Sequence, residues 1–204
     1  MTPLLPVFFK MEGRPCLVVG GGNIALEKVR VLLECGTAVR VVAREASREI
    51  QELAGESRIT LRIKAYQPQD LESAAFIIAA TNDRDLNHRI YREAVAAGKL
   101  VNVVDDPEYC DFYFGSIVRR GALQIGISTA GESPAFAQQL KREIDEALPG
   151  DTGKWLEKLG ELRRHINQSV PPGPERISLL RELAKREICD AETCPCRALL
   201  RPSA

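Results

Sequence analysis

Two glycines and an alanine near the amino terminus have the spacing of a phosphate-binding turn. Gly20, Gly22 and Ala25 fit the pattern G-x-G-x-x-G/A, in which the first glycine makes a tight turn, the second leaves room for a pyrophosphate and the third residue lets helix and strand pack closely. The phosphates would lie on backbone N–H groups where a helix begins, around Asn23 and Ile24. An apolar run precedes the turn and an amphipathic segment follows it, which favours dinucleotide binding over an ordinary turn.

The identity of the dinucleotide depends on residues about 20 positions further on, where a carboxylate typically binds the ribose hydroxyls of NAD. The sequence has Arg44-Glu45 there. Glu45 suits the ribose of NAD, Arg44 suits the extra phosphate of NADP, and both also suit a solvated strand end. These three interpretations stay open on the residues alone.

Polar residues follow two further apolar runs. Thr81 and Asn82 come directly after residues 76–80, and Asp105 and Asp106 follow residues 100–104. Open α/β sheets bind ligands beyond the carboxyl ends of their strands, so we expect Thr81 and Asn82 beside the cofactor. A carboxylate at 105 or 106 could act as a general base beside a nicotinamide, or hold a cationic pyrrole nitrogen or a metal. The alternative is a plain turn, which Asp-Asp-Pro favours.

Basic and polar residues of the next region would suit an anionic substrate. The turn that contains Ser128 and Thr129 precedes a helix start at Ser133-Pro134, so it could receive an anion there or simply cap the helix. Arg119 and Arg120 would suit a polycarboxylate, although paired charges also make a solvated face.

Three cysteines, Cys189, Cys194 and Cys196, lie close together near the carboxyl end. Their thiolates could bind zinc or join an iron–sulfur ligand set. Their spacing completes no four-ligand pattern, so a redox-active tail is the alternative. His88 and His165 have no partner at ligand spacing. The metal, if one binds, is therefore unknown, with Asp105 and the three cysteines as candidate ligands.

Alternating strands and helices must position these residues. Apolar runs predict strands, and amphipathic segments predict helices between them; the strands are expected at 15–19, 38–42, 60–63, 76–80 and 100–104, and the helices at 25–35, 47–53 and 87–97. This order predicts an α/β fold with a Rossmann-type doubly wound parallel sheet. Residues 3–10 predict an extended lead-in or an edge strand, because Pro3 and Pro6 cannot donate to a central ladder.

Beyond residue 105 the alternation stops. Two strands around a turn are expected at 112–118 and 123–127, followed by helices at 133–148, 153–168 and 175–188. A proline-rich linker at 171–174 separates the last two helices.

Composition narrows the class of protein. The 204 residues are 45% hydrophobic and 27% charged, as in a soluble globular protein with one core and an appendage or two small domains. Lys+Arg and Asp+Glu both total 28, so no global charge favours nucleic acid or an anionic membrane. No signal peptide or membrane span is expected. The 6 cysteines, two of them in predicted core segments, favour reduced thiols and a cytoplasmic location.

Taken in order, the motifs resemble the precorrin-2 dehydrogenases of siroheme synthesis, a family that includes the amino-terminal module of siroheme synthase and a yeast bifunctional dehydrogenase/ferrochelatase. The resemblance covers residues 1 to about 148. It is carried by residues 6–9, 18–22 with Ala25 and Lys28, 80–83 with Leu86-Asn87, 101–105, 112–116, and 127–131 with Ser133-Pro134.

This resemblance implies an NAD-binding Rossmann domain over 1–113, a small α+β dimerisation region over 114–148 and a helical carboxyl-terminal part over 149–204. It implies a homodimer that oxidises precorrin-2 to sirohydrochlorin with NAD as hydride acceptor and, in some members, inserts Fe²⁺ as a second substrate. Asp105 falls where the family has its catalytic aspartate, and Thr129 where some relatives have a serine in the substrate pocket. The cysteine tail has no counterpart in the family.

Two other functions remain compatible with parts of the sequence. An NAD-sensing regulatory module without catalysis would explain residues 20–25 but not residues 102–105 or 128–134. A chelatase or metal-delivery protein with a vestigial nucleotide site would give the cysteine tail a role.

Overall fold

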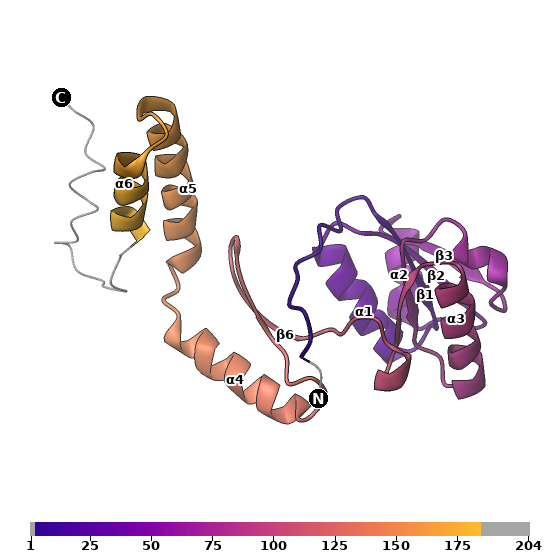
Figure 1. Cartoon of the computed structure of the whole chain (residues 1–204). Helices are drawn as coiled ribbons and strands as arrows, with labels where there is room; N and C mark the ends of the chain where they lie inside the picture. Colours follow the sequence, from indigo (N-terminus) through magenta and orange to yellow (C-terminus); the bar gives the residue numbers. More distant parts are fainter. Residues whose placement is uncertain (1–2, 185–204) are drawn as a thin grey trace. The chain divides into compact units, whose positions relative to one another are not determined.

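The computed structural model describes residues 3–184. They belong to two compact units, of which the first ends at Phe114 and the second begins at Gly115 (Figure 1).

The first unit is built on a sheet of five parallel strands in the order β3-β2-β1-β4-β5. The strands are β1 (Pro15–Val19), β2 (Ala38–Ala43), β3 (Thr60–Ile63), β4 (Phe76–Ala79) and β5 (Leu100–Val103). In the register of the sheet, Val19 lies opposite Val42 on one side and Ala79 on the other. The strand order reverses between β1 and β4, and such a switch point is where open α/β sheets bind ligands.

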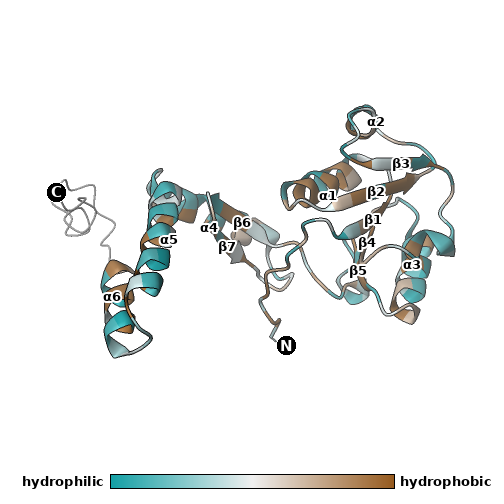
Figure 2. Cartoon of the chain, turned by 90° about the horizontal axis from the view of Figure 1, so that it is seen from above, coloured by the Kyte–Doolittle hydropathy of each residue, from teal (hydrophilic) through white to brown (hydrophobic). Residues whose placement is uncertain are grey.

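Helices cover both faces of this sheet. The helices α1 (Asn23–Glu34) and α2 (Arg48–Gly55) bury Val29 and Ile50 against one face, and α3 (Arg84–Ala96) buries Ile90 against the other. Figure 2 shows the consequence in hydropathy, since the central strands are mostly hydrophobic and the helices carry hydrophobic and hydrophilic residues together. The predicted doubly wound α/β fold is confirmed.

Some element boundaries differ from the sequence-based expectation. The lead-in at residues 3–10 is extended but forms no strand; instead, the Phe9 ring packs edge-on against Phe76 at 5.2 Å. The helix α3 begins at Arg84 rather than at residue 87, because the Asp83 carboxylate accepts a hydrogen bond from the Leu86 N–H at 3.0 Å and caps the helix. Two short 3₁₀ turns, η1 (Pro68–Leu71) and η2 (Pro107–Tyr109), were not predicted.

The second unit is an antiparallel hairpin followed by three helices. Its elements are β6 (Ser116–Arg120), β7 (Leu123–Ile127), α4 (Pro134–Ala147), α5 (Thr152–Ser169) and α6 (Pro174–Ala184). Arg120 connects the hairpin to α4 through an ion pair with Asp145 at 2.6 Å. A side chain at Gly153 would come within 2.9 Å of the Arg120 backbone, so the hairpin turn and the start of α5 pack without a side chain between them.

The second unit buries little of its apolar surface. Within residues 115–184 the buried hydrophobic residues are Val118, Ala137 and Leu183. Phe136 and Ile177 are 55% and 51% exposed. No helix in the described part of the chain is long and apolar enough to cross a membrane.

An ion pair secures the connection between β3 and β4. The Asp70 carboxylate, only 2% exposed, accepts hydrogen bonds from the Lys64 ammonium at 2.7 Å and the Gln67 N–H at 2.9 Å. Burial alone would raise the pKa of Asp70, but these two donors outweigh it and hold the pKa below its usual value.

We therefore expect Asp70→Asn to lower the free energy of unfolding at pH 7 by about 1–3 kcal/mol. A carboxylate whose pKa is depressed in the folded state contributes stability above its unfolded pKa, near 3.9, and this contribution is lost as the pH falls through the folded pKa. Urea unfolding should show the difference between the proteins at pH 7, and the difference should shrink as the pH falls below about 4. The exposed Asp85→Asn serves as control; equal stability of all three proteins at pH 7 would contradict the assignment.

Candidate functional site

The glycine turn lies between the carboxyl ends of β1 and β4. Gly20 has a φ of +130°, and a Cβ there would lie 2.2 Å from the Ala80 carbonyl oxygen. Only glycine adopts this conformation at this distance from another backbone. Gly20 therefore lets the chain leave β1 directly beside the end of β4.

Gly21 fixes the turn to the end of β2. A Cβ on Gly21 would lie 2.0 Å from the Glu45 carbonyl oxygen, and the Gly21 carbonyl accepts a hydrogen bond from the Ser47 N–H at 2.8 Å. Position 21 is a variable position in the G-x-G-x-x-G/A pattern, so the glycine spacing does not predict this role. The uninterrupted run of three glycines was the available signal.

Gly22 has the open space that the other two glycines lack. It is the N-cap residue of α1, with no side-chain cap, and nothing lies within 4 Å of where its Cβ would be. The first intrahelical bond runs from the Leu26 N–H to the Gly22 carbonyl at 3.0 Å, so the N–H groups before Leu26 have no acceptor within the helix. Together with the helix dipole, this arrangement fits a dinucleotide pyrophosphate.

The other predicted residues of the turn and beyond β2 differ in exposure. Asn23 and Ile24 are exposed, whereas Ala25 is buried and allows the close packing of α1. Arg44 and Glu45 are both exposed directly beyond β2. The backbone of Glu45 is held by its close approach to Gly21.

Thr81 is held in place by a buried amide. The Asn87 side chain, 6% exposed, lies with its Oδ1 2.6 Å from the Thr81 hydroxyl and donates from its Nδ2 to the Thr81 carbonyl at 2.9 Å. Asn82 next to it is exposed. Asn87 is a positioning residue that its sequence position, early in a helix, did not reveal.

The two acids after β5 have different surroundings. Asp105 is exposed and has a left-handed φ of +61°. Asp106 accepts hydrogen bonds from His88 Nε2 at 2.7 Å and Arg84 Nε at 3.2 Å, and these donors, His88 first, hold the pKa of Asp106 below its usual value. Asp106 is therefore an ionised structural acid, and Asp105 is the acid that is accessible for chemistry.

The chain that leaves this edge folds back along β5. The Asn102 side chain, 6% exposed, donates to the Phe112 carbonyl at 2.8 Å, and Asn102 forms an isolated antiparallel bridge with Cys110. The Asp111 carboxylate accepts a hydrogen bond from the Val101 N–H at 2.9 Å. These bonds fix the segment that connects the end of β5 to the second unit.

The remaining predicted substrate residues belong to the second unit. The Ser128 hydroxyl accepts a hydrogen bond from the Ala130 N–H at 3.1 Å, and the Thr129 hydroxyl accepts one from the Ser133 N–H at 3.3 Å. Arg119 is half-buried, and Arg120 binds Asp145. The carboxyl edge of the first sheet thus brings together the glycine turn, Thr81, Asn82 and Asp105, while Ser128, Thr129, Arg119 and Arg120 form part of the other unit.

The candidate metal ligands do not form a cluster within the described residues. Between residues 3 and 184, no group of three or more His, Cys, Asp or Glu side chains could hold a metal ion. Cys189, Cys194 and Cys196 lie outside the described residues.

The glycine turn and the sheet agree with the family models that match the chain. Residues 7–116 match the model of an NAD(P)-binding family, and residues 120–147 match the central domain of sirohaem biosynthesis proteins. The first unit therefore defines an NAD(P)-binding protein of the Rossmann type.

Individual relatives narrow this class. The siroheme synthase of Methylococcus capsulatus is 41% identical over 167 residues, covering 82% of this chain and 35% of that protein. The siroheme synthase of Ectopseudomonas mendocina is 40% identical over 188 residues, covering 92% of this chain and 40% of that protein. This chain thus spans less than half the length of either relative. Among solved structures, SirC, a precorrin-2 dehydrogenase, has a TM-score of 0.75 at 28% identity over 88% of this chain and 89% of its own. The chain belongs to the precorrin-2 dehydrogenase family of siroheme synthesis.

Gly21 and Gly22 should respond differently to alanine. Gly21→Ala should destabilise the fold by about 1–3 kcal/mol, because its methyl group would overlap the Glu45 backbone. Gly22→Ala should cost less than about 1 kcal/mol in stability but weaken NAD binding at least about tenfold, because its methyl group would enter the space for the pyrophosphate. Thermal unfolding and calorimetric titration with NAD measure the two effects. Unchanged NAD affinity in Gly22→Ala would contradict the position of the phosphates.

Proposed function

We propose that this chain oxidises precorrin-2 to sirohydrochlorin with NAD as hydride acceptor. The observation that carries the proposal is the accessible Asp105, which follows β5 on the same sheet edge as the glycine turn. The likeness to SirC, a precorrin-2 dehydrogenase, supports it because that likeness extends over 88% of this chain and therefore includes more than a nucleotide-binding unit.

The proposed reaction removes a hydride and a proton from the reduced macrocycle. Bound NAD would accept the hydride. The Asp105 carboxylate would accept the proton and, as a fixed negative charge, would favour the cationic character that develops when the hydride leaves. Asp106 cannot take this role without giving up its hydrogen bonds to His88 and Arg84.

NAD rather than NADP is the proposed cofactor, with Glu45 as the residue that binds the adenosine ribose. The position of Glu45 supports this role, because Glu45 lies directly beyond β2 and its backbone packs closely against Gly21. Substitution of the neighbouring Arg44 should therefore change NAD affinity less than substitution of Glu45.

The polycarboxylate substrate requires basic and polar groups, and Ser128, Thr129 and Arg119 are the proposed ones. Arg120 is already engaged within the protein, because its guanidinium donates hydrogen bonds to both the carboxylate and the carbonyl of Asp145. A substrate role for Arg120 therefore competes with its link between hairpin and α4.

The two rival functions explain less of the chain. An NAD-sensing module needs only the first unit. It does not explain why residues 120–147 match the family model of the central domain of sirohaem biosynthesis proteins. A chelatase with a vestigial nucleotide site does not account for the three glycines, whose packing and open space fit a pyrophosphate. We also propose that the chain inserts Fe²⁺ as a second substrate, with Asp105 as the residue that takes part. The experiment on dehydrogenase activity below tests this insertion as well.

The decisive variant is Asp105→Asn, which removes the charge while keeping a side chain that tolerates a positive φ. We expect NAD-dependent sirohydrochlorin formation to fall at least about a hundredfold, with unchanged thermal unfolding. Product analysis with precorrin-2, NAD and Fe²⁺ added stepwise separates NADH formation from iron insertion. Asp85→Asn, an exposed substitution of the same type on α3, is the matched control, and near-normal turnover by Asp105→Asn would refute the catalytic role.

Residues 114–148, the hairpin and α4 of the second unit, are the proposed site of homodimer formation. Val118 and Arg120 face α4, because Val118 is buried and Arg120 binds Asp145, so Ile117 lies on the opposite face of the hairpin. The few buried hydrophobic residues of this unit support a partner surface there.

Sedimentation of the full chain should therefore give twice the mass of one chain. Ile117→Glu should give monomers, because a carboxylate in a packed interface is costly. Ile177→Glu, on the exposed side of α6, should leave the dimer intact and is the control. A wild-type monomer would overturn the proposed assembly.

A further inference from the structure

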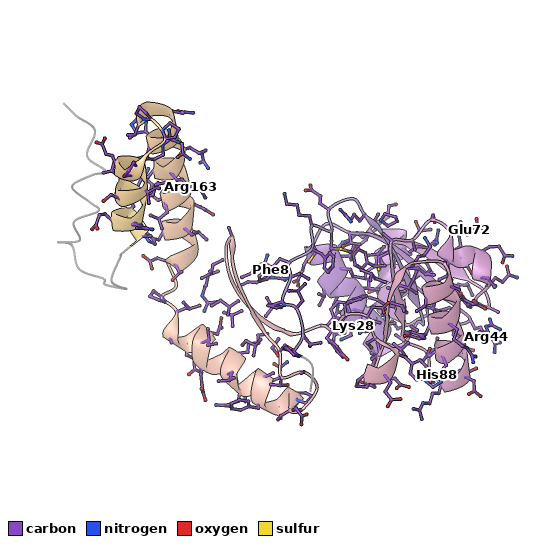
Figure 3. The ribbon with its side chains drawn as sticks, in the orientation of Figure 1. Phe8, Lys28, Arg44, Glu72, His88 and Arg163 are labelled. Carbon is purple, nitrogen blue, oxygen red and sulfur yellow. The ribbon has the colours of Figure 1, made fainter. Side chains whose placement is uncertain are left out.

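The Asp106 carboxylate is held by a cluster of side chains that the proposed reaction does not use. Its side chain is 13% exposed, and its two donors differ in burial, since the side chain of His88 is 20% exposed and that of Arg84 is 77% exposed. Figure 3 shows His88 on α3, toward the end of the unit where this helix begins. An ionised carboxylate can only accept hydrogen bonds, so Nε2 of His88 carries the proton in this pair.

His88 also contacts the other end of the turn that Asp106 begins. The imidazole ring stacks on the Tyr109 ring, with centroids 3.8 Å apart and planes inclined by 13°. The Tyr109 N–H donates to the Asp106 carbonyl at 3.0 Å, and Tyr91 packs edge-on against Tyr109 at 5.1 Å. One side chain of α3 therefore holds both ends of residues 106–109, which we call the Asp106 turn.

Asp105 stands between this turn and the sheet. The preceding Val104 N–H donates to the Ala79 carbonyl at 3.0 Å, which continues the ladder between β4 and β5. Asp105 itself has a φ of +61°, a conformation that costs about 1 kcal/mol or more for a residue other than glycine unless its surroundings impose it. The sheet fixes one side of Asp105, and the Asp106 turn fixes the other.

We propose that His88 is a positioning residue for Asp105: by holding Asp106 and Tyr109 against α3, it keeps Asp105 in the conformation in which its carboxylate serves the reaction. The consequence for catalysis rests on the proposed function, whereas the consequence for the backbone does not. The two are therefore tested separately.

The first test measures amide hydrogen exchange in the full chain. Glutamine places its side-chain nitrogen where histidine has Nε2, whereas asparagine is too short to reach Asp106. In His88→Asn, the amides of Asp106 and Tyr109 should exchange at least about tenfold faster than in the wild type. In His88→Gln, their exchange should stay closer to that of the wild type, and amides of α1 should not change in either variant. Equal exchange at Asp106 and Tyr109 in His88→Asn and the wild type would overturn the proposal.

The second test measures kinetics with precorrin-2 and NAD. His88→Asn should lower kcat about tenfold to a hundredfold with KM for NAD within about twofold, and His88→Gln should recover much of the loss. If His88 acts through Asp105, then His88→Asn should lower the residual rate of Asp105→Asn no further. The matched control is His165→Asn, because His165 is an exposed histidine on α5.

The outcomes separate the two proposals. A wild-type protein that does not oxidise precorrin-2 refutes the proposed function, and hydrogen exchange still decides whether His88 holds the turn. The wild type could instead be active while the double variant loses the product of the two single-variant losses in rate. That result would show that His88 does not act through Asp105, and would refute its positioning role.

Discussion

The site depends on the close approach of three backbone segments around the glycine turn. Gly20 lies against the carbonyl of Ala80 beyond β4, and Gly21 lies against the carbonyl of Glu45 beyond β2, at distances that exclude any side chain. The absence of side chains at these two positions brings the ends of three parallel strands to one point. Gly22 then stands at the start of α1 with unoccupied space beside it, and the unpaired N–H groups of the helix face that space.

The same edge shows how neighbouring residues of one type take different roles. Asp105 and Asp106 are adjacent acids, but only Asp106 is paired with cationic or ring N–H donors. These donors keep Asp106 ionised and engaged in structure. A similar division occurs beyond β4, where the buried Asn87 amide holds Thr81 and leaves Asn82 exposed. In both loops, a residue of α3 supplies the support and a loop residue remains accessible.

Much of this arrangement could be predicted from the sequence. Short segments rich in apolar residues located the five strands, and the glycine spacing located the turn, because both signals are local in the chain. The contributions of Gly21, Asn87 and His88 could not be predicted in the same way. Gly21 and His88 depend on contacts with residues that are distant in sequence, Glu45 and Asp106. Asn87 contacts the nearby Thr81, but only the folded loop shows which side chain its amide meets. For residues 3–10, the sequence left an extended lead-in and an edge strand open. The structure has no strand there, and Phe9 instead packs against Phe76, a contact that is also distant in sequence.

The bridge between Asn102 and Cys110 has a consequence for the synthesis of the protein. The strand β5 is the last in the sheet, and an outermost strand can recruit other chains through its unpaired N–H and C=O groups. Residues 110–112 cover part of that border through their contacts with Asn102 and Val101. Because the whole first unit is continuous in sequence, it can close against aggregation while the second unit is still leaving the ribosome.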